Sequence, residues 1–214
     1  MNEILNPGQE EYIKTFRNEK DPLIIELEEY AKENRVPILN WQSAEFLEQL
    51  VTFQKPKRVL EIGTAIAYSS IRIARSLNKK SKLFTIEKSE DNLEKAKANI
   101  AAAGLEHKIN LIFGDALDVM PKLDKKFDLI FLDADKEDYQ RLFDYSLLLL
   151  RKNGVMFVDN LLWHGFAASS RVPAAFKNST AHIREFNKMF MSQKSLYTTI
   201  LPIGDGIGLG IRIK

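Results

Sequence analysis

The stretch RVLEIGTAIAYSS, residues 58–70, decides the fold of this chain. An apolar, partly β-branched run ends in the acid Glu61, turns at Gly63 and enters a helix that we expect to start near Tyr68. A strand, a glycine turn and a helix in this order are typical of a site for a nucleotide-like cofactor. Loops of this kind usually carry a second glycine at the helix entrance, where this chain has Ala67. The stretch therefore predicts a cofactor-binding unit with one departure from the usual pattern.

Strands and helices alternate downstream of this stretch. We expect strands in KRVLEI, KLFTIE, KINLIFGD, FDLIFLDA and GVMFVDN, and helices in YSSIRIARSL, SEDNLEKAKANIAAAG and EDYQRLFDYSLLLLRKNG. Apolar strands that alternate with helices indicate a parallel sheet covered on both faces. Two strand-like runs surround Gly204-Asp205-Gly206 and are joined so closely that they must be antiparallel. We predict a doubly wound, mostly parallel α/β sheet of about seven strands with an antiparallel C-terminal hairpin at one edge.

The two flanks of this pattern differ from it. The first 50 or so residues are expected to be helical, and Asp21 followed by Pro22 is a typical helix start. Residues 160–180 show no clear periodicity and are predicted to form a long loop, which is often functional in a compact domain. We therefore expect one domain over residues 1–214, with a helical segment at 1–53 packed on an α/β core at 54–214.

Composition limits the class of protein. The 214 residues are 45% hydrophobic and 28% charged, as in a globular domain with a sizeable core. No apolar run approaches the roughly 20 residues that span a bilayer, and the acidic N-terminal stretch lacks the apolar part of a signal peptide. The absence of cysteine excludes disulfides, thiolate catalysis and cysteine-ligated metals. We expect a cytoplasmic protein without membrane association, and its net charge of +2 allows nucleic-acid binding without indicating it.

Acidic residues follow the predicted parallel strands. Ligands of open α/β sheets bind at the carboxyl ends of the strands. The acids at those ends are Glu61, Glu87, Asp115, Asp133 and Asp159. Glu87 lies 24 residues after Gly63, close to the spacing at which an acid accepts ribose hydroxyls, although it could instead only charge the start of a helix. The full G-x-G-x-x-G pattern is absent, which argues against a nicotinamide dehydrogenase.

Five motifs together resemble one enzyme family. They are LEIGTAIAYSSIRIA (60–74), TIEKSEDNLEKAKANI (85–100), FGDALDVMP (113–121), FDLIFLDADKEDY (127–139) and DNLLWHG (159–165). Their combination resembles the cation-dependent S-adenosylmethionine O-methyltransferases of the catechol and caffeoyl-CoA group, which have a Rossmann-like fold. Within that group, EYAKENRVPIL (29–39) and LPIGDGIGLGIRIK (201–214) are most similar to bacterial tRNA 5-hydroxyuridine methyltransferases.

This resemblance implies a set of cofactor contacts. The residues expected to bind S-adenosylmethionine are Leu39, Glu61, Gly63, Tyr68, Ser69, Glu87, Asp115, Ala116 and Asp133. Among them, Gly63, Tyr68 and Ser69 would shape the pocket for the methionine end, and Glu87 would hold the ribose hydroxyls. Ala67 departs from the family pattern, but alanine is a good helix former and an adenosyl sulfonium carries no phosphate that needs a closer approach. We therefore expect a working site.

The resemblance also implies a metal and a catalytic lysine. Asp133, Asp159 and Asn160 would supply two carboxylates and an amide oxygen, a donor set that favours a hard cation such as Mg²⁺, or Mn²⁺. Asp159 and Asn160 could alternatively only cap a strand. Lys136 matches the family's active-site lysine and would act with Asp133 in catalysis by taking the hydroxyl proton, or it could simply form an ion pair with Asp133 or Glu137.

Three functions remain open at this point. The first is methylation of 5-hydroxyuridine at the wobble position of tRNA, with the anticodon loop as partner and phosphate contacts at Arg171, Lys177 and Arg184. The second is methylation of a small catechol-like or caffeoyl-CoA-like diol. The third is a non-enzymatic relic, against which the retained metal and lysine positions argue. In the loop, Trp163 and Phe166 could stack on a planar ring or pin the loop to the core. His164 is expected to line the substrate pocket, and the family leads us to expect a homodimer.

Overall fold

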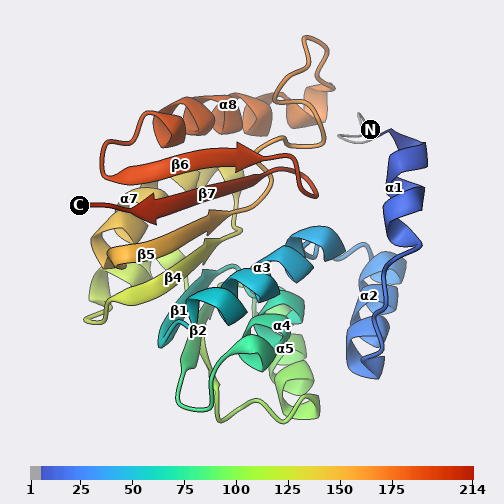
Figure 1. Ribbon diagram of the computed structural model, residues 1–214, viewed down its shortest axis with the longest axis vertical. Coiled ribbons are helices and arrows are strands. Elements are labelled where there is room, and N and C mark those ends of the chain that lie inside the picture. Colours follow the sequence, from blue (N-terminus) through green and yellow to red (C-terminus); the bar gives the residue numbers. More distant parts are fainter. Residues whose placement is uncertain (1–5) are drawn as a thin grey trace.

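A computed structural model describes residues 6–214 of the chain. Its seven-stranded sheet has the order β3-β2-β1-β4-β5-β7-β6 (Figure 1). The strands are β1 (Arg58–Ile62), β2 (Lys82–Glu87), β3 (Ile109–Phe113), β4 (Phe127–Leu132), β5 (Leu150–Val158), β6 (Leu196–Leu201) and β7 (Ile207–Arg212). β1 to β5 pair in parallel, whereas β7 is antiparallel to both β5 and β6. The predicted sheet, with its antiparallel hairpin at one edge, is confirmed.

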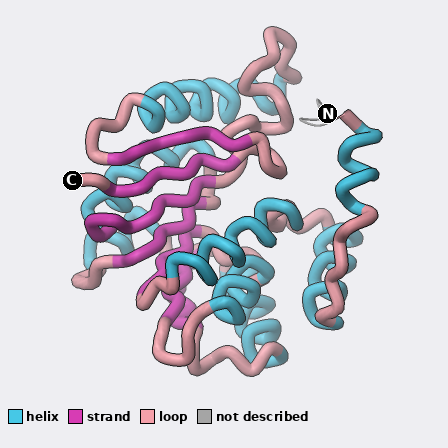
Figure 2. Tube along the Cα trace, viewed as in Figure 1, coloured by secondary structure: helices cyan, strands magenta, loops and turns pink. Residues whose placement is uncertain are grey.

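Helices cover both faces of the sheet (Figure 2). Successive strand residues point to opposite faces, so in β1 Val59 joins one hydrophobic core and Leu60 and Ile62 join the other. The first core is closed by α4 (Tyr68–Ser76) and α5 (Glu90–Ala102) together with the N-terminal helices. The second is closed by α6 (Ala116–Val119), α7 (Tyr139–Leu149) and α8 (Lys177–Met191). The uniformly apolar strands of the sequence are explained by this burial on two sides.

The N-terminal part is helical, as expected. It contains α1 (Pro7–Lys14), α2 (Pro22–Asn34) and α3 (Trp41–Gln54), and α2 and α3 pack against α4. Asp21 caps α2 by accepting hydrogen bonds from the backbone of Leu23 and Ile24, which confirms the predicted helix start. Within residues 6–214, no helix has both the length and the apolar character needed to cross a membrane.

The helix predicted over residues 137–154 is wrong at both ends. A short 3₁₀ helix occupies Lys136–Asp138, α7 begins at Tyr139, and α7 ends at Leu149. Leu150 already pairs with Phe127 of β4, and the register then shifts before the pairing continues. Asn153 is left-handed, with φ 61°, and lies within this irregular part of β5. The run of leucines at 147–150 continues a helical pattern, but pairing with the sheet decides the last of them.

The loop predicted over residues 160–180 is shorter than expected. A 3₁₀ turn spans Ala174–Phe176 and α8 begins at Lys177, so the last four residues of the predicted loop are helical, and α8 as a whole was not predicted. The helix buries Ile183, Phe186 and Phe190 at helical spacing. No side chain caps its N-terminus, which removes the usual start signal from the sequence.

Candidate active site

The carboxyl ends of the neighbouring strands β2, β1, β4 and β5 are joined by backbone hydrogen bonds into one edge of the sheet. The residue that follows each of three strands donates its backbone N–H to one of the last two carbonyls of the adjacent strand. These bonds are Gly63 N to Ile86 O at 3.2 Å, Asp133 N to Ile62 O at 3.0 Å and Asp159 N to Leu132 O at 3.1 Å. The sheet therefore brings the predicted glycine turn and the two predicted metal-binding aspartates into one row.

Position 63 requires glycine because the backbone of Asp133 lies directly against it. A Cβ at this position would lie 1.9 Å from the backbone oxygen of Asp133, and the residue has φ +100°. Only glycine tolerates both conditions. The predicted turn at Gly63 is thus present, and it holds the start of the cofactor loop against the end of β4.

The expectation for Ala67 needs correction. Ala67 is the N-cap of α4 and adopts a left-handed conformation, with φ 67° and ψ 22°, so helix propensity does not explain alanine there. Ala65 is left-handed too, with φ 48°. The loop is held from outside, because Glu87 Oε2 accepts the Ala65 N–H at 2.8 Å and the Asn99 amide donates to Ile66 O at 2.9 Å. Contacts from β2 and α5 therefore support a backbone that glycine would adopt freely.

Glu61 is fully buried within β1. Ser69 Oγ donates to its Oε1 at 2.6 Å and Ser70 Oγ donates to its Oε2. Burial raises the pKa of Glu61 to about 7, although the serine hydroxyls favour the charged form. Glu61 and Ser69 thus bond to each other and tie β1 to the first turn of α4.

The remaining predicted cofactor residues lie at the end of β2, after β3 and between α2 and α3. Glu87 is buried at the end of β2 and also accepts the Ser89 N–H at 2.8 Å, so it supports both the cofactor loop and the start of α5. Asp115 is exposed after β3 and caps α6, whose first residue is Ala116. Leu39 is buried in the segment between α2 and α3, not within a helix. Of these residues, Glu87 bonds directly to the loop, and contact with a cofactor stays a prediction for each of them.

Lys136 lies at the centre of the edge. Its Nζ donates to Asp133 Oδ1 at 3.2 Å, Ala134 O at 3.0 Å and Tyr139 Oη at 2.6 Å. The predicted ion pair with Asp133 is therefore present, while Glu137 bonds to Asn178 instead. Three acceptors are the number that a protonated amine satisfies, so in this arrangement the lysine is a fixed positive charge.

Asp159 has the properties of a metal ligand. Its side chain is only 2% exposed, and its Oδ1 is buried without a hydrogen-bond partner. Burial and then the nearby charge of Asp133 raise the pKa of Asp159 well above its usual value. A buried carboxylate of this kind is costly unless it meets a proton or a cation.

The oxygen donors beside Asp159 fit a hard cation. The Asn160 amide nitrogen donates a hydrogen bond to Asp205 Oδ2 at 3.3 Å. The amide oxygen of Asn160 is therefore free to act as a metal ligand. Among the residues that the structure describes, no three His, Cys, Asp or Glu side chains are grouped as a metal site. The predicted set differs because it uses two carboxylates and an amide, an all-oxygen set that suits Mg²⁺ or Mn²⁺. The donors of Asp133, Asp159 and Asn160 are thus compatible with such an ion.

Asp205 is a site residue that the sequence analysis missed. Its Oδ1 accepts the backbone N–H of His164 at 2.6 Å, and burial raises the pKa of its carboxyl. Because β7 runs antiparallel to β5, the turn before β7 lies beside the carboxyl end of β5. The acid between Gly204 and Gly206 could have been placed at the site from this topology.

The loop after β5 carries a cluster of aromatic side chains. Asn160, Trp163 and His164 are all left-handed, with φ between 48° and 62°. The Trp163 indole donates to Ser179 Oγ at 3.1 Å and its ring lies 5.5 Å from Lys136 Nζ, whereas Phe166 is buried. Phe166 packs against His164 and Phe176, whereas Trp163 packs against the second hydrophobic core and borders the Lys136 edge.

The three predicted phosphate contacts line a recess of about 640 Å³ beside this loop. Arg184 is largely committed within the protein, because its guanidinium donates to the backbone oxygens of Phe166, Ala167 and Ser169. Within residues 6–214, neither Arg171 nor Lys177 uses its side chain in an ion pair. The recess is thus cationic, but one of its three charges also holds the loop in place.

Comparison with known proteins agrees with this geometry. Residues 15–213 match a family model described as O-methyltransferase. The chain is 30% identical over 224 residues to a catechol O-methyltransferase from Niastella koreensis, covering 99% of each chain. It is 30% identical over 215 residues to a caffeoyl-CoA O-methyltransferase from Populus kitakamiensis, covering 97% of this chain and 88% of the relative. The solved structure of an O-methyltransferase of tomaymycin synthesis from Streptomyces achromogenes, in complex with S-adenosylmethionine, is 28% identical and superimposes with a TM-score of 0.83 over 95% of each chain.

Proposed function

The chain belongs to the O-methyltransferase family of the caffeoyl-CoA and catechol type, and from this premise we propose that it methylates one hydroxyl of a small aromatic diol. It is an S-adenosylmethionine-dependent O-methyltransferase. The relatives described above are named for small acceptors. This favours the small-molecule alternative over the tRNA substrate that the sequence motifs suggested.

The methyl donor is proposed to lie along the loop at Gly63. S-adenosylmethionine supplies a methyl group on a positively charged sulfur. The carboxylate of Glu87 is proposed to accept the ribose hydroxyls with the lone pairs that its two backbone N–H donors leave free. Asp115 and Ala116 are proposed to border the adenine, Leu39 to close over the cofactor, and Asp133 to lie beside the sulfonium.

A divalent cation is proposed at Asp133, Asp159 and Asn160. When bound, Mg²⁺ or Mn²⁺ lowers the pKa of a hydroxyl that contacts it. The unpaired Oδ1 of Asp159 is the observation that carries this proposal, because a buried carboxylate oxygen without a hydrogen-bond donor is available to bind a cation. The second oxygen of a vicinal diol would orient the ring, which gives a reason for an acceptor with two adjacent oxygens.

Lys136 is proposed either to accept the proton of the reacting hydroxyl or to stabilise the negative charge that forms on its oxygen. Ala134 O and Tyr139 Oη hold its Nζ at the edge, so the amine cannot swing away when Asp133 is engaged elsewhere. To accept a proton it must first lose one of the three hydrogens that it now donates. As an ammonium it would instead stabilise the negative charge that forms on the acceptor oxygen.

The direct test is transfer of a labelled methyl group to matched acceptors. Catechol and a caffeoyl-CoA-type thioester should be labelled, whereas phenol, which lacks the second oxygen, should not. A chelator should abolish the reaction and added Mg²⁺ should restore it. Equal labelling of phenol and catechol, or full activity in the chelator, would contradict the proposal.

A second candidate acceptor is 5-hydroxyuridine in the anticodon loop of tRNA. The cationic recess at Arg171 and Lys177 supports it, because phosphates flanking a splayed base would find positive charge there. If this reading holds, tRNA carrying 5-hydroxyuridine should be labelled and tRNA lacking the hydroxyl should not. The double substitution Arg171→Ala with Lys177→Ala should then raise the KM for tRNA and leave the kinetics with catechol unchanged.

Two further expectations from the sequence stay predictions. The homodimer can be measured by sedimentation of the purified protein. The single domain, with residues 1–53 packed on 54–214, should unfold in one cooperative transition.

A further inference from the structure

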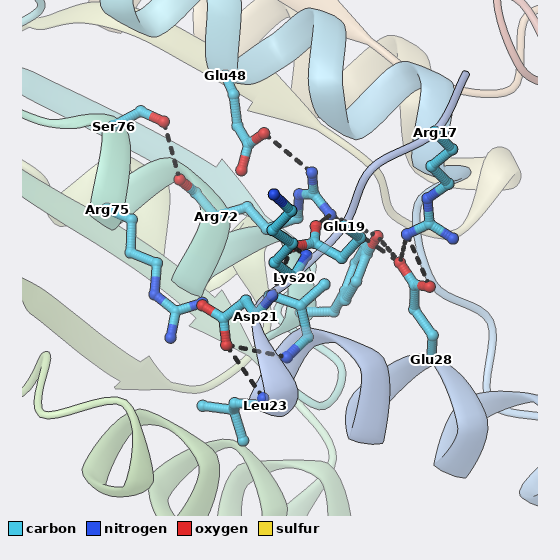
Figure 3. A network of polar contacts seen from close by, with 12 residues as sticks. Arg17, Glu19, Lys20, Asp21, Leu23, Glu28, Glu48, Arg72, Arg75 and Ser76 are labelled. Carbon is cyan, nitrogen blue, oxygen red and sulfur yellow. Dashed lines mark hydrogen bonds and ion pairs between the residues drawn. The ribbon is translucent and has the colours of Figure 1, made fainter.

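A network of charged side chains connects the N-terminal segment to the helix that follows the cofactor loop (Figure 3). At its centre is Arg72 of α4, whose side chain is only 4% exposed. Its Nη1 donates to Glu19 Oε2 at 3.0 Å, and its Nη2 donates to Glu48 Oε2 at 2.9 Å. A third acid, Glu28, has its Oε1 3.9 Å from Nη1. One buried cation on α4 therefore meets three acids.

These acids come from three separate places in the N-terminal segment. Glu19 lies in the link between α1 and α2, Glu28 lies in α2, and Glu48 lies in α3. Arg17 holds Glu28 through two hydrogen bonds of 2.6 and 2.8 Å. The network thus forms only when the link, α2 and α3 are all seated against α4.

Tyr68 connects this network to the cofactor loop. It is the first residue of α4 and directly follows the left-handed Ala67. Its ring is buried, its hydroxyl donates to Glu28 Oε1 at 2.6 Å, and Arg72 Nη1 donates to the same hydroxyl at 3.1 Å. The side chain expected to shape the cofactor pocket therefore points its hydroxyl into the charge network.

The backbone of the cofactor loop needs support from outside the loop, and the connection through Tyr68 supplies part of it. Ala65 and Ala67 occupy a backbone region that is unfavourable for alanine, and such residues stay there only when their surroundings hold them. Glu87 and Asn99 hold the loop from the β2 and α5 side. Tyr68 holds its other end, where no side chain caps the helix. Because a buried ion network is often no more stable than apolar packing, fixing one geometry is a better reason for it than stability alone.

We propose that Arg72, acting through Glu28 and Tyr68, is a positioning residue that couples the seating of the N-terminal segment to the affinity of the cofactor loop for S-adenosylmethionine. Arg72 itself does not touch the cofactor. The inference goes beyond the proposed acceptor, since it concerns only the methyl donor and holds for a diol or for tRNA alike.

The test compares binding of S-adenosylhomocysteine by calorimetry in the wild type and three single variants. Tyr68→Phe removes one hydroxyl and keeps the ring, and Arg72→Met removes the central charge. Both should weaken binding by about fivefold to tenfold, the lower end of the usual range for a coupling between sites. Arg75→Met is the matched control, because the Arg75 pair with Asp21 joins α4 to the start of α2 without touching Tyr68, and its affinity should change less than twofold.

A second readout follows from the reciprocity of coupling. S-adenosylhomocysteine should slow tryptic cleavage after the exposed Lys20 in the wild type and in Arg75→Met, but not in Arg72→Met. In turnover, the KM for S-adenosylmethionine should rise in Arg72→Met, while kcat and the KM for the acceptor stay within twofold. A purely structural role would lower the melting temperature without producing this split.

Three results would overturn the proposal. One is wild-type affinity in both folded Tyr68→Phe and folded Arg72→Met. Another is an equal loss in Arg75→Met, which would assign the effect to general loosening of α2. The third is additive losses when Tyr68→Phe and Glu28→Ala are combined, because two groups that act through one hydrogen bond should lose affinity only once. If Arg72→Met fails to fold, Tyr68→Phe alone decides the question.

Discussion

Gly63→Ala tests the connection between the cofactor loop and the metal-binding edge. The added Cβ would lie 1.9 Å from the backbone oxygen of Asp133, and contacts under 3.0 Å essentially never occur. The two backbones must therefore separate by about 1.1 Å, a shift comparable with the 1 Å misplacement that can lower an enzymatic rate by about 100-fold. We expect kcat/KM to fall by about that factor, which corresponds to about 2.7 kcal/mol.

The control for this substitution is Gly104→Ala. Gly104 also has a positive φ, of +65°, but an added Cβ there would meet nothing within 4 Å. Both substitutions therefore share the cost of placing alanine in a left-handed region, about 1–2 kcal/mol of stability. Only Gly63→Ala should also move Asp133.

The assay is methyl transfer together with calorimetric binding of S-adenosylhomocysteine and a thermal melt. Gly104→Ala should lose stability and keep both binding and turnover. Gly63→Ala should lose turnover well beyond its loss of stability. If the folded Gly63→Ala protein keeps kcat/KM within about fivefold of the wild type, the reasoning from this close approach is refuted.

Four further outcomes are expected. Asp159→Ala should abolish methyl transfer while the affinity for S-adenosylhomocysteine stays within about threefold, because the unpaired Oδ1 is proposed to face the ion and not the adenosyl group; comparable losses in both would count against the metal assignment. Lys136→Met should lower kcat by about 100-fold with little change in cofactor affinity, and unchanged turnover would reduce the lysine to its ion pair with Asp133. Because burial raises the pKa of Glu61 from about 4.5 to about 7, the folded state holds a proton that the unfolded state releases, so stability should fall by up to about 3 kcal/mol as pH rises from about 4.5 to about 7, and this part of the profile should be absent in Glu61→Gln. Ala67→Gly should change cofactor affinity by less than about tenfold and stability by less than about 1 kcal/mol, since relief of left-handed strain is offset by chain entropy and a lost buried methyl; a gain of several hundredfold in affinity would mean that the loop is impaired.

The centre of the sheet was predictable because β1, β2 and β4 are largely buried on both faces and end in recognisable turns. Val59 and Leu60 are both fully buried, in different cores, so no amphipathic alternation complicated the pattern. The boundary between α7 and β5 was not predictable in the same way. Leu150 continues a run of leucines that suits a helix equally well, and only pairing with Phe127 assigns it to the sheet.

The site was predictable in position but not in its contacts. Glu61 near the end of β1 and the acids after β4 and β5 had to meet at one edge because the strands are parallel. That Lys136 is held by Tyr139, and that Tyr68 turns toward Glu28, depends on long-range packing that no local pattern contains. Asp205 could have been found, since the antiparallel hairpin places its turn beside β5.

The alanine at the helix entrance shows how a loop can lose a glycine and keep its shape. A glycine in the left-handed region needs no help, whereas Ala67 must be held there by groups outside the loop. Glu87 provides one such contact from β2, Asn99 another from α5, and the hydroxyl of Tyr68 a third toward the N-terminal segment. The geometry that a glycine would carry locally is therefore distributed over three elements of the fold. For the same reason, the loop of this enzyme should be more sensitive to distant substitutions than a loop with both glycines would be.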